Sequence, residues 1–424
     1  MSQRIAIVGG GIAGLTAAWY LSRDHQVEVF EAEPRLGGHT FTVDVHREHG
    51  DYAVDMGFIV FNDRTYPRFE ALLSELGIGR QPTAMGFAVT DAETGVEYCG
   101  DGLGGFFGRR RNLLDPGHWA LLRDILRFNR EAPALLDSDA GEQPLGAYLN
   151  EQGYGERFRR HYILPMGGAI WSCSLAQMEA FPAKFFVRFF INHGLLALRN
   201  RPQWYVVPGG SSRYVEALRE TCSARFHTAT PVTGVSRDSE GVTVRTGDQS
   251  HRFDQVVMAC HSDQTLALLA DADPRERDCL ADLRYQPNDV VLHTDTAMLP
   301  KRRRVWSSWN ALLGRTDDAE PVQVTYNMNI LQGFQAPETF CVTLNAGDRI
   351  RPETVIRREV FYHPLFTTEG LLARERLLAG NGENRTWFCG AWCRNGFHED
   401  GVVSALDVVE GIGTRVHGGP GAAL

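Results

Sequence analysis

The chain has 424 residues, 43% of them hydrophobic, which is enough for two or three domains with sizeable cores. A formal net charge of −9 argues against general nucleic-acid binding. The eight cysteines lack paired metal-ligand spacings, so we expect reduced thiols, no metal site and a cytoplasmic location.

The N-terminal residues predict a strand, a glycine-rich turn and a helix. Arg4–Val8 is a mostly β-branched run and Leu15–Leu21 follows a helical pattern, so no signal peptide is expected. In the turn, the first glycine permits a tight bend, the second lets a pyrophosphate approach the backbone, and the third lets the helix pack closely. This is the fingerprint of a dinucleotide-binding fold, with the phosphates at the positive end of the helix. The residues expected to contact the ligand are Gly9, Gly11, Ile12, Ala13 and Gly14.

A second strand, Val27–Phe30, ends at an acidic residue that is followed by another glycine pair. The Glu31 carboxylate can accept hydrogen bonds from a ribose diol. The glycine pair lets the backbone approach the pyrophosphate again, and Arg35 adds a charge-assisted contact. A protein that buries a whole FAD needs this second loop. The alternative interpretation of the segment is an ordinary turn. The cofactor contacts expected here are Glu31, Ala32, Arg35, Gly37, Gly38 and His39.

The stretch Tyr52–Phe58 predicts a strand that ends at a glycine, which places Met56, Gly57 and Phe58 against a flavin ring. The segment that follows is expected to be mainly helical, with Trp119–Asn129 and Pro144–Glu151 as clear candidates.

The stretch Phe181–Leu198 has an unusual composition, with five phenylalanines in ten positions and one thin polar stripe. It is either a core helix or a helix that lines an acyl tunnel or touches lipid. Two basic clusters, Arg109–Arg111 and Lys301–Arg304, are either solvated loops or contacts with an anionic membrane surface.

The second half of the chain is expected to be rich in strands. Pro231–Val235 and Val242–Arg245 predict a meander that ends at Gln255–Cys260. A second sheet is expected from Val290–His293, Val322–Tyr326 and Phe340–Leu344.

Near the C-terminus, Thr386–Trp392 predicts a buried strand that ends in a turn at a glycine. A helix that begins near Gly401 and runs to Ile412 would aim backbone N–H groups at the negative charge of reduced flavin. The cofactor contacts expected here are Gly390, Ala391, Asp400, Gly401 and Val402.

These motifs together resemble the flavin-containing amine oxidoreductase superfamily, which includes monoamine oxidases, protoporphyrinogen oxidases and carotenoid desaturases. The resemblance rests on the fingerprint with Glu31, on Arg35–Gly38, on the pair Gly209–Gly210 before a helix, and on Gly390. It implies an α/β (α+β) fold with a Rossmann-like FAD-binding domain of the glutathione-reductase and amine-oxidase type. A substrate domain of mixed helix and sheet is inserted into it.

The resemblance also implies boundaries and departures. The FAD-binding domain is expected at 1–80, 203–283 and 380–424, and the substrate domain at 81–202 and 284–379. In the family, the residue equivalent to Val232 contacts adenine through its backbone. His39 stands where the family often has Arg, and Ala391 where it often has an acid, which counts against an ordinary amine oxidase.

A narrower resemblance is to a bacterial branch of predicted FAD-binding proteins encoded beside enzymes similar to cyclopropane-fatty-acid synthase. It rests on His39–Thr40, Asp55–Asn62, Leu164–Ser172 and Gly396–Gly401. It implies that an unsaturated fatty acyl chain in lipid gives a hydride to flavin N5, with the enzyme in the cytoplasm or at the inner face of the membrane. An amine or polyene oxidase, and a non-catalytic flavin-binding partner of a lipid methyltransferase, are the alternatives.

Oxidation of an acyl chain also requires a base. His398 is the first candidate, because the resemblance places it near the flavin and imidazole titrates near neutral pH. Glu399 is the second candidate, and both residues could instead bind flavin or cap a helix. Trp171 is expected either to face the flavin ring from the substrate domain or to lie in the core.

Overall fold

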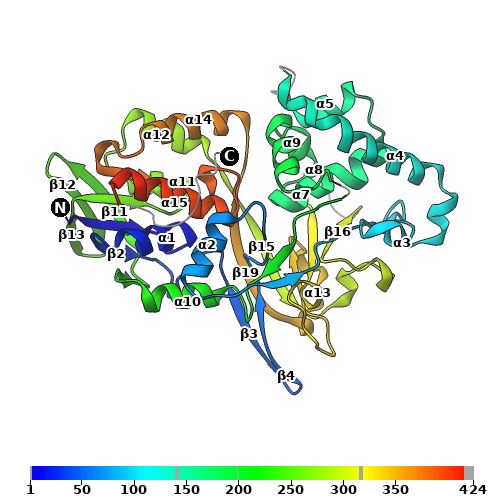
Figure 1. Cartoon of the computed structure of the whole chain (residues 1–424), viewed down its shortest axis with the longest axis horizontal. Coiled ribbons are helices and arrows are strands. Elements are labelled where there is room, and N and C mark those ends of the chain that lie inside the picture. Colours follow the sequence, from blue (N-terminus) through cyan, green and yellow to red (C-terminus); the bar gives the residue numbers. More distant parts are fainter. Residues whose placement is uncertain (1, 139–142, 198, 315–318, 415–424) are drawn as a thin grey trace.

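Two large sheets organise the molecule, a parallel sheet on the left of Figure 1 and a mixed sheet that continues toward the helices on the right. The structure is a computed structural model, and it describes residues 2–138, 143–197, 199–314 and 319–414. The expected α/β architecture, with a Rossmann-like sheet and a second mixed unit, is confirmed.

The parallel sheet gathers strands that lie far apart in the sequence. Its order is β10 (Arg225–His227), β2 (Gln26–Phe30), β1 (Arg4–Val8), β14 (Gln255–Met258) and β20 (Thr386–Phe388). Side chains of β1 alternate between two cores because successive residues of a strand face opposite sides.

Helices cover one face of this sheet, and further strands and helices cover the other. Ile5 and Ile7 pack among helices α1 (Ile12–Leu21), α2 (Pro67–Glu75), α10 (Ser212–Thr221) and α15 (His398–Ile412). Ala6 and Val8 belong to the opposite core. Its covering elements are β11 (Val232–Asp238), β12 (Gly241–Thr246), β13 (Gln249–Phe253), α11 (Ser262–Leu268), α12 (Pro274–Asp282) and α14 (Thr368–Ala379). Strands β11 and β12 are the first two strands of the predicted meander, but its third strand is β13, which was not predicted. The expectation that the meander ends at Gln255–Cys260 is wrong, because this segment forms β14 of the parallel sheet.

The second sheet has seven strands and is mostly antiparallel. Their order is β19 (Val355–Pro364), β15 (Tyr285–His293), β18 (Cys341–Leu344), β17 (Gln323–Asn327), β16 (Trp309–Leu313), β7 (Phe87–Asp91) and β8 (Glu97–Cys99). Strands β15, β17 and β18 were predicted. Strands β7 and β8 come from the segment expected to be mainly helical, and β19 was missed.

Helices of the 81–202 segment pack against this sheet and form the largest core. They are α3 (Gly102–Phe106), α4 (Pro116–Glu131), α5 (Leu145–Glu151), α6 (Glu156–Phe158), α7 (Leu164–Trp171), α8 (Leu175–Glu179) and α9 (Ala183–Asn192), and α13 (Met328–Leu331) joins from the later part of the chain. Helix α9 ends before the predicted Leu198 because Gly194 adopts a positive φ of 64° and stops it. Phe186, Val187 and Phe190 are buried, so α9 is largely a core helix.

Two small antiparallel units connect the halves. Strands β3 (Thr42–Arg47) and β4 (Gly50–Asp55) form the hairpin that projects downward in Figure 1. Strands β5 (Phe61–Asn62), β9 (Trp204–Val206) and β6 (Gln81–Thr83) form a three-stranded unit. Among the residues the structure describes, no helix is long and apolar enough to cross a membrane.

The expectation that the last helix begins near Gly401 is wrong, because α15 begins at His398. The Asp400 carboxylate accepts a hydrogen bond of 2.8 Å from the Phe397 N–H and so helps to start the helix three residues earlier. Gly401 therefore lies within the first turn. A Cβ on it would lie 2.7 Å from Ile12 Cγ2, so this glycine lets α15 and α1 pack closely.

Candidate active site

A cavity of about 1300 Å³ extends from the carboxyl ends of β1 and β2 to helices α3 and α4. Val8 and Phe30 line it at the first end, and Leu103 and Ile125 line it at the other. Ligand pockets usually measure roughly 300–1000 Å³, so this one has room for a dinucleotide followed by a second molecule. The carboxyl ends of parallel strands are also where α/β sheets bind dinucleotides.

Each of the three glycines of the first turn is needed for a different structural reason. Gly9 has a φ of +110°, and a Cβ there would lie 2.8 Å from Ala259 O. A Cβ on Gly14 would lie 2.0 Å from Gly9 O, so only glycine allows α1 to approach β1 this closely. A Cβ on Gly11 would meet no atom within 4 Å. Gly11 therefore borders open space directly before the N-terminus of α1, where a phosphate is stabilised.

The acid and the second glycine loop lie on the same side of the cavity. Glu31 accepts a 2.7 Å hydrogen bond from the Gly10 N–H and lines the cavity. Arg35 donates to the carbonyl oxygens of Gly38 (2.9 Å) and Thr40 (3.2 Å). Arg35 thus holds the second glycine loop in shape, and it also lines the cavity. A dinucleotide bound at this end of the cavity would face the Glu31 carboxylate, the Arg35 guanidinium and two backbone turns.

Most of the predicted cofactor residues line this single cavity. They are Gly9, Gly11, Ile12, Ala13, Glu31, Ala32, Arg35, Gly37, Gly38, His39, Met56, Gly57, Phe58, Val232, Gly390 and Ala391. Four others do not line it, namely Gly14, Asp400, Gly401 and Val402. The early start of α15 explains three of these, because it turns Asp400 toward its own helix cap and buries Gly401 and Val402 against neighbouring helices.

His39 is neutral, unlike the arginine that the family often has at this position. Burial, with a smaller contribution from the nearby His261, lowers its pKa to about 4. Its Nε2 atom is buried and has no hydrogen-bond partner within the described part of the chain. A buried polar atom without a partner indicates a group that a ligand can satisfy. The cavity therefore fits a flavin at this position.

His398 lies in a hydrogen-bonded group that sequence reasoning did not find. Its Nε2 atom is 2.6 Å from the Tyr214 hydroxyl and 3.3 Å from Thr40 Oγ1. Its ring stacks on Phe58, with centroids 3.6 Å apart and planes 6° apart. Burial holds its pKa well below the usual value, with a further contribution from His39, so the ring is neutral. Its Nδ1 has no hydrogen-bond partner among the described residues.

The Glu399 carboxylate serves a neighbouring helix and does not line the cavity. Its two oxygens accept hydrogen bonds from the backbone N–H groups of Arg68 (2.9 Å) and Phe69 (2.8 Å), in the first turn of α2. This is the helix-capping alternative, and the positive end of a helix suits a carboxylate. We therefore do not retain Glu399 as a candidate base.

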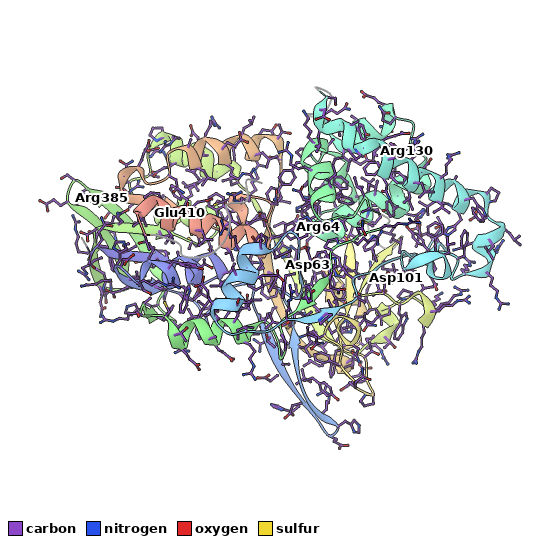
Figure 2. The ribbon with its side chains drawn as sticks, in the orientation of Figure 1. Asp63, Arg64, Asp101, Arg130, Arg385 and Glu410 are labelled. Carbon is purple, nitrogen blue, oxygen red and sulfur yellow. The ribbon has the colours of Figure 1, made fainter. Side chains whose placement is uncertain are left out.

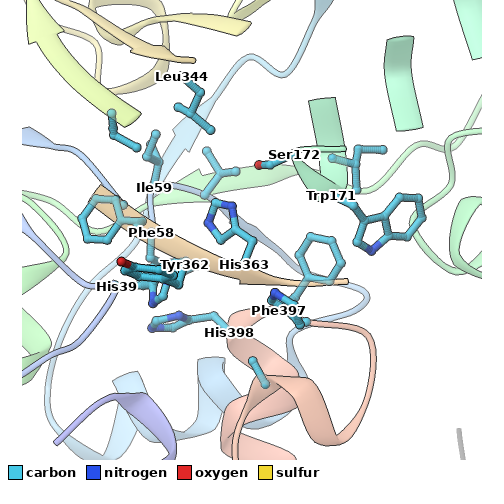
Figure 3. A pocket seen from close by; sticks show the side chains of 18 of the residues that line it. His39, Phe58, Ile59, Trp171, Ser172, Leu344, Tyr362, His363, Phe397 and His398 are labelled. Carbon is cyan, nitrogen blue, oxygen red and sulfur yellow. The ribbon is translucent and has the colours of Figure 1, made fainter. Parts of the chain in front are cut away.

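Trp171 lies in the core and also borders the cavity. It is only 4% exposed, and its ring lies 4.6 Å from Phe181 and 4.7 Å from Phe189. Figure 3 shows Trp171 and Phe397 on one side of the cavity, with Phe58 and His39 on the other. The two expectations for Trp171 are thus compatible.

Several lining residues were missed because they lie on unpredicted or distant elements. His363 is on β19, the strand that was not predicted, and burial lowers its pKa to about 3. His261 lies beside His39, with ring centroids 5.9 Å apart. Tyr214 lies on α10, the helix that was expected after the pair Gly209–Gly210. The sequence carries no local signal for any of these three contacts.

Metal and disulfide chemistry have no site in the described residues. These residues contain no group of three or more histidine, cysteine or acidic side chains that could hold a metal ion. All eight cysteines are free thiols.

The glycine turn, the acid after the second strand, the second glycine loop and the apolar space beyond them define the class, an FAD-binding oxidoreductase fold. Comparison with known families narrows this class to one family. The chain belongs to the family described as "Flavin containing amine oxidoreductase", whose model matches residues 12–302. FAD is the cofactor of this family, and the lining residues fit it.

Among curated proteins, the chain is similar to "Putative flavin-containing monoamine oxidase AofH" of Mycobacterium tuberculosis. The two are 29% identical over 255 residues, which cover 58% of this chain and 54% of that protein. The match thus spans about half the length of this curated relative.

Two solved structures show the same fold over nearly the whole chain. The fatty acid isomerase of P. acnes that produces CLA has a TM-score of 0.70 at 16% identity, covering 97% of this chain and 99% of that one. Cyclohexylamine oxidase of Brevibacterium oxydans has a TM-score of 0.64 at 16% identity, covering 97% and 100%.

Proposed function

We propose that this protein is an FAD-dependent oxidoreductase that oxidises an unsaturated fatty acyl chain. The observation that carries the proposal is the composition of the substrate end of the cavity. Of the described lining residues contributed by the 81–202 segment, only Asp101 and Arg201 belong to the acidic or basic types, while Leu103, Phe106 and Ile125 are typical of the rest. His193 also lines it, but burial lowers its pKa to about 4, so it is neutral. A long apolar substrate suits such a lining better than a cation does.

Relatives provide additional support for this substrate class. The P. acnes protein is named for its action on a fatty acid, and its fold covers nearly the whole of this chain. The neutral His39, in place of the cation often found in the family, also distinguishes this site from that of an ordinary amine oxidase.

Desaturation removes one hydride and one proton from the acyl chain. FAD would supply the hydride acceptor when bound, and the residues that we expect to hold it are the two glycine loops, Glu31 and Arg35, which line the cavity. The apolar walls orient the acyl carbon and exclude water. Our candidate for the proton acceptor is His398, which lines the cavity and is neutral because its pKa is lowered. In the tautomer that carries its proton on Nε2, this proton is donated to the Tyr214 hydroxyl, and Nδ1 keeps the lone pair that would accept the substrate proton.

Anaerobic reduction of the FAD-loaded protein tests the proposal. We expect the yellow flavin absorbance to fade when an unsaturated fatty acid or phospholipid is added, and to return when air is admitted. A saturated chain of the same length is the matched control and should leave the spectrum unchanged. If no unsaturated acyl lipid bleaches the flavin, the proposal is wrong, and a non-catalytic role beside a lipid methyltransferase gains support.

Amine oxidation is the second candidate, and the name of the M. tuberculosis relative favours it. The stacked pair of Phe58 and His398 provides aromatic surfaces on which an amine could bind. Bleaching by amines and not by acyl lipids would establish this alternative.

A further inference from the structure

The substrate end of the cavity reaches the surface between helices α3 and α4. Leu103 and Leu126 line the cavity and are also 68% and 44% exposed. Side chains that line a cavity and are also exposed to solvent mark the mouth of that cavity. Figure 1 shows α3 and α4 at the end of the molecule away from the parallel sheet, and Figure 2 labels Asp101, the residue directly before α3, at the same end.

Exposed apolar side chains are concentrated around this mouth. Eight large hydrophobic residues are exposed in the described part of the chain, and five of them lie between positions 103 and 126. Besides the two leucines at the mouth, these are Leu113, Leu114 and Trp119, and Leu114 is 86% exposed. The Trp119 indole N–H donates to Leu113 O at 3.0 Å, which holds the start of α4 against the short turn before it. Several large apolar side chains exposed on neighbouring elements of a protein surface indicate a binding site.

The two basic clusters lie side by side at this patch, although about 190 positions separate them in the sequence. Glu97 joins them. Its carboxylate accepts hydrogen bonds from the backbone N–H (3.1 Å) and Nη1 (3.2 Å) of Arg302. Its carbonyl oxygen accepts one from Asn112 Nδ2 (3.2 Å), directly after Arg109–Arg111. Gly108 and Val305 also touch, since a Cβ on Gly108 would lie 2.8 Å from Val305 Cγ2.

Four cations of the clusters are available to a ligand. Arg110, Arg111, Lys301 and Arg304 are exposed, and none of them forms an ion pair with a described residue. They form a local basic surface on a chain whose net charge is −9. We name the four cations together with Leu103, Leu113, Leu114, Trp119 and Leu126 the mouth surface.

We propose that the mouth surface docks on an anionic phospholipid bilayer and so places the cavity mouth against the acyl chains. The inference rests on the proposed function, because an acyl chain is the cargo that must enter. Exposed leucines and an indole enter the boundary between head groups and acyl chains, while lysine and arginine meet the anionic head groups. A bilayer fits better than an acidic protein, because two of the exposed leucines, Leu103 and Leu126, also line the cavity that the acyl chain must enter.

Cosedimentation of the FAD-loaded protein with vesicles tests the docking surface without any turnover. We expect binding to vesicles of phosphatidylcholine mixed with phosphatidylglycerol, weaker binding to phosphatidylcholine alone, and release by high salt. Each cation near an anionic surface contributes about five-fold to partitioning, so Arg110→Gln with Arg111→Gln should weaken binding about 30-fold. Leu113→Ser with Leu114→Ser should weaken it by at least about tenfold.

The matched control is Arg219→Gln with Leu372→Ser, which removes one exposed cation and one exposed leucine on α10 and α14, outside the mouth surface. This control should bind vesicles as the parent does. Retention of the yellow flavin spectrum shows that every variant is folded. Failure of the parent protein to bind the mixed vesicles, or equal binding by the mouth variants, overturns the docking proposal.

The two proposals fail in distinguishable ways. If dispersed unsaturated fatty acid bleaches the flavin but no vesicle is bound, the docking proposal is wrong and the acyl substrate stands. If vesicles are bound through the mouth surface but no acyl lipid bleaches the flavin, the docking surface stands and the proposed reaction is wrong.

Discussion

Substitution of Gly11 and of Gly14 should damage the protein in two different ways. A Cβ on Gly14 would lie 2.0 Å from Gly9 O and 3.3 Å from Ala259 Cβ, so Gly14→Ala must push α1 away from β1. Overpacking of this kind costs about 1–3 kcal/mol of the free energy of unfolding. A Cβ on Gly11 meets nothing within 4 Å, and its extended backbone (φ −76°, ψ −176°) suits valine. Gly11→Val should therefore cost the fold only about 1 kcal/mol or less, as a changed helix cap.

The effect of Gly11→Val on FAD should be much larger than its effect on folding. The added methyl groups enter the open space before α1, where the pyrophosphate binds to backbone N–H groups. Loss of two charge-assisted hydrogen bonds, at about 1.5–3 kcal/mol each, raises the Kd for FAD at least about 100-fold.

The assay compares the two apoproteins by denaturant unfolding and then by titration with FAD. Gly11→Val should unfold near the parent midpoint but lose FAD binding, whereas Gly14→Ala should unfold earlier and still bind FAD where it is folded. A Gly11→Val protein that binds FAD as tightly as the parent would refute the reasoning. So would a Gly14→Ala protein that unfolds at the parent midpoint.

Three further predictions concern the substrate side of the site. His398→Ala should leave a yellow protein whose turnover falls about 10²–10⁴-fold if this residue is the base, whereas loss of colour would make it a binding residue. Burial raises the pKa of Glu399 to about 7, above its usual 4.5, so the folded protein keeps a proton that the unfolded chain releases. The free energy of unfolding should therefore fall as pH rises from about 4.5 to 7. Thermal unfolding of Glu399→Gln should show a weaker loss of stability over that range. An equal loss in this variant would count against the raised pKa of Glu399. Ile125→Trp should narrow the cavity near its mouth, so flavin bleaching by acyl lipid should slow while FAD titration is unchanged. Ile125→Val is its control, and unaltered bleaching by the tryptophan variant would contradict the proposed substrate route.

The parts of the site that could be predicted are those whose chemistry is local in the chain. Gly9 and Gly14 are required by close contacts within or beside the turn itself. The acid Glu31 directly follows β2 and accepts a hydrogen bond from the same turn. The later strands were found where apolar residues run or alternate, as in β15 and β18. Strand β19 was missed because charged residues such as Arg357 and Arg358 interrupt the alternation.

The parts that could not be predicted depend on contacts across the folded chain. Thr40 and Tyr214 are 174 positions apart, yet they share a hydrogen bond beside His398. Glu399 caps a helix that begins more than 300 positions earlier in the chain. The start of α15 was misplaced because Phe397 is not a preferred residue type before a helix, so the later glycine attracted the prediction.

The parallel sheet has a consequence for biosynthesis. Its edge strand β20 and helix α15 come more than 350 positions after the first glycine turn in the chain. A nascent chain therefore cannot close the flavin pocket until this whole intervening length and α15 have been translated, and such long-range pairing is intrinsically slow. Because a tightly bound ligand stabilises only the closed form, vitamin supply should set how much of this chain escapes proteolysis after synthesis.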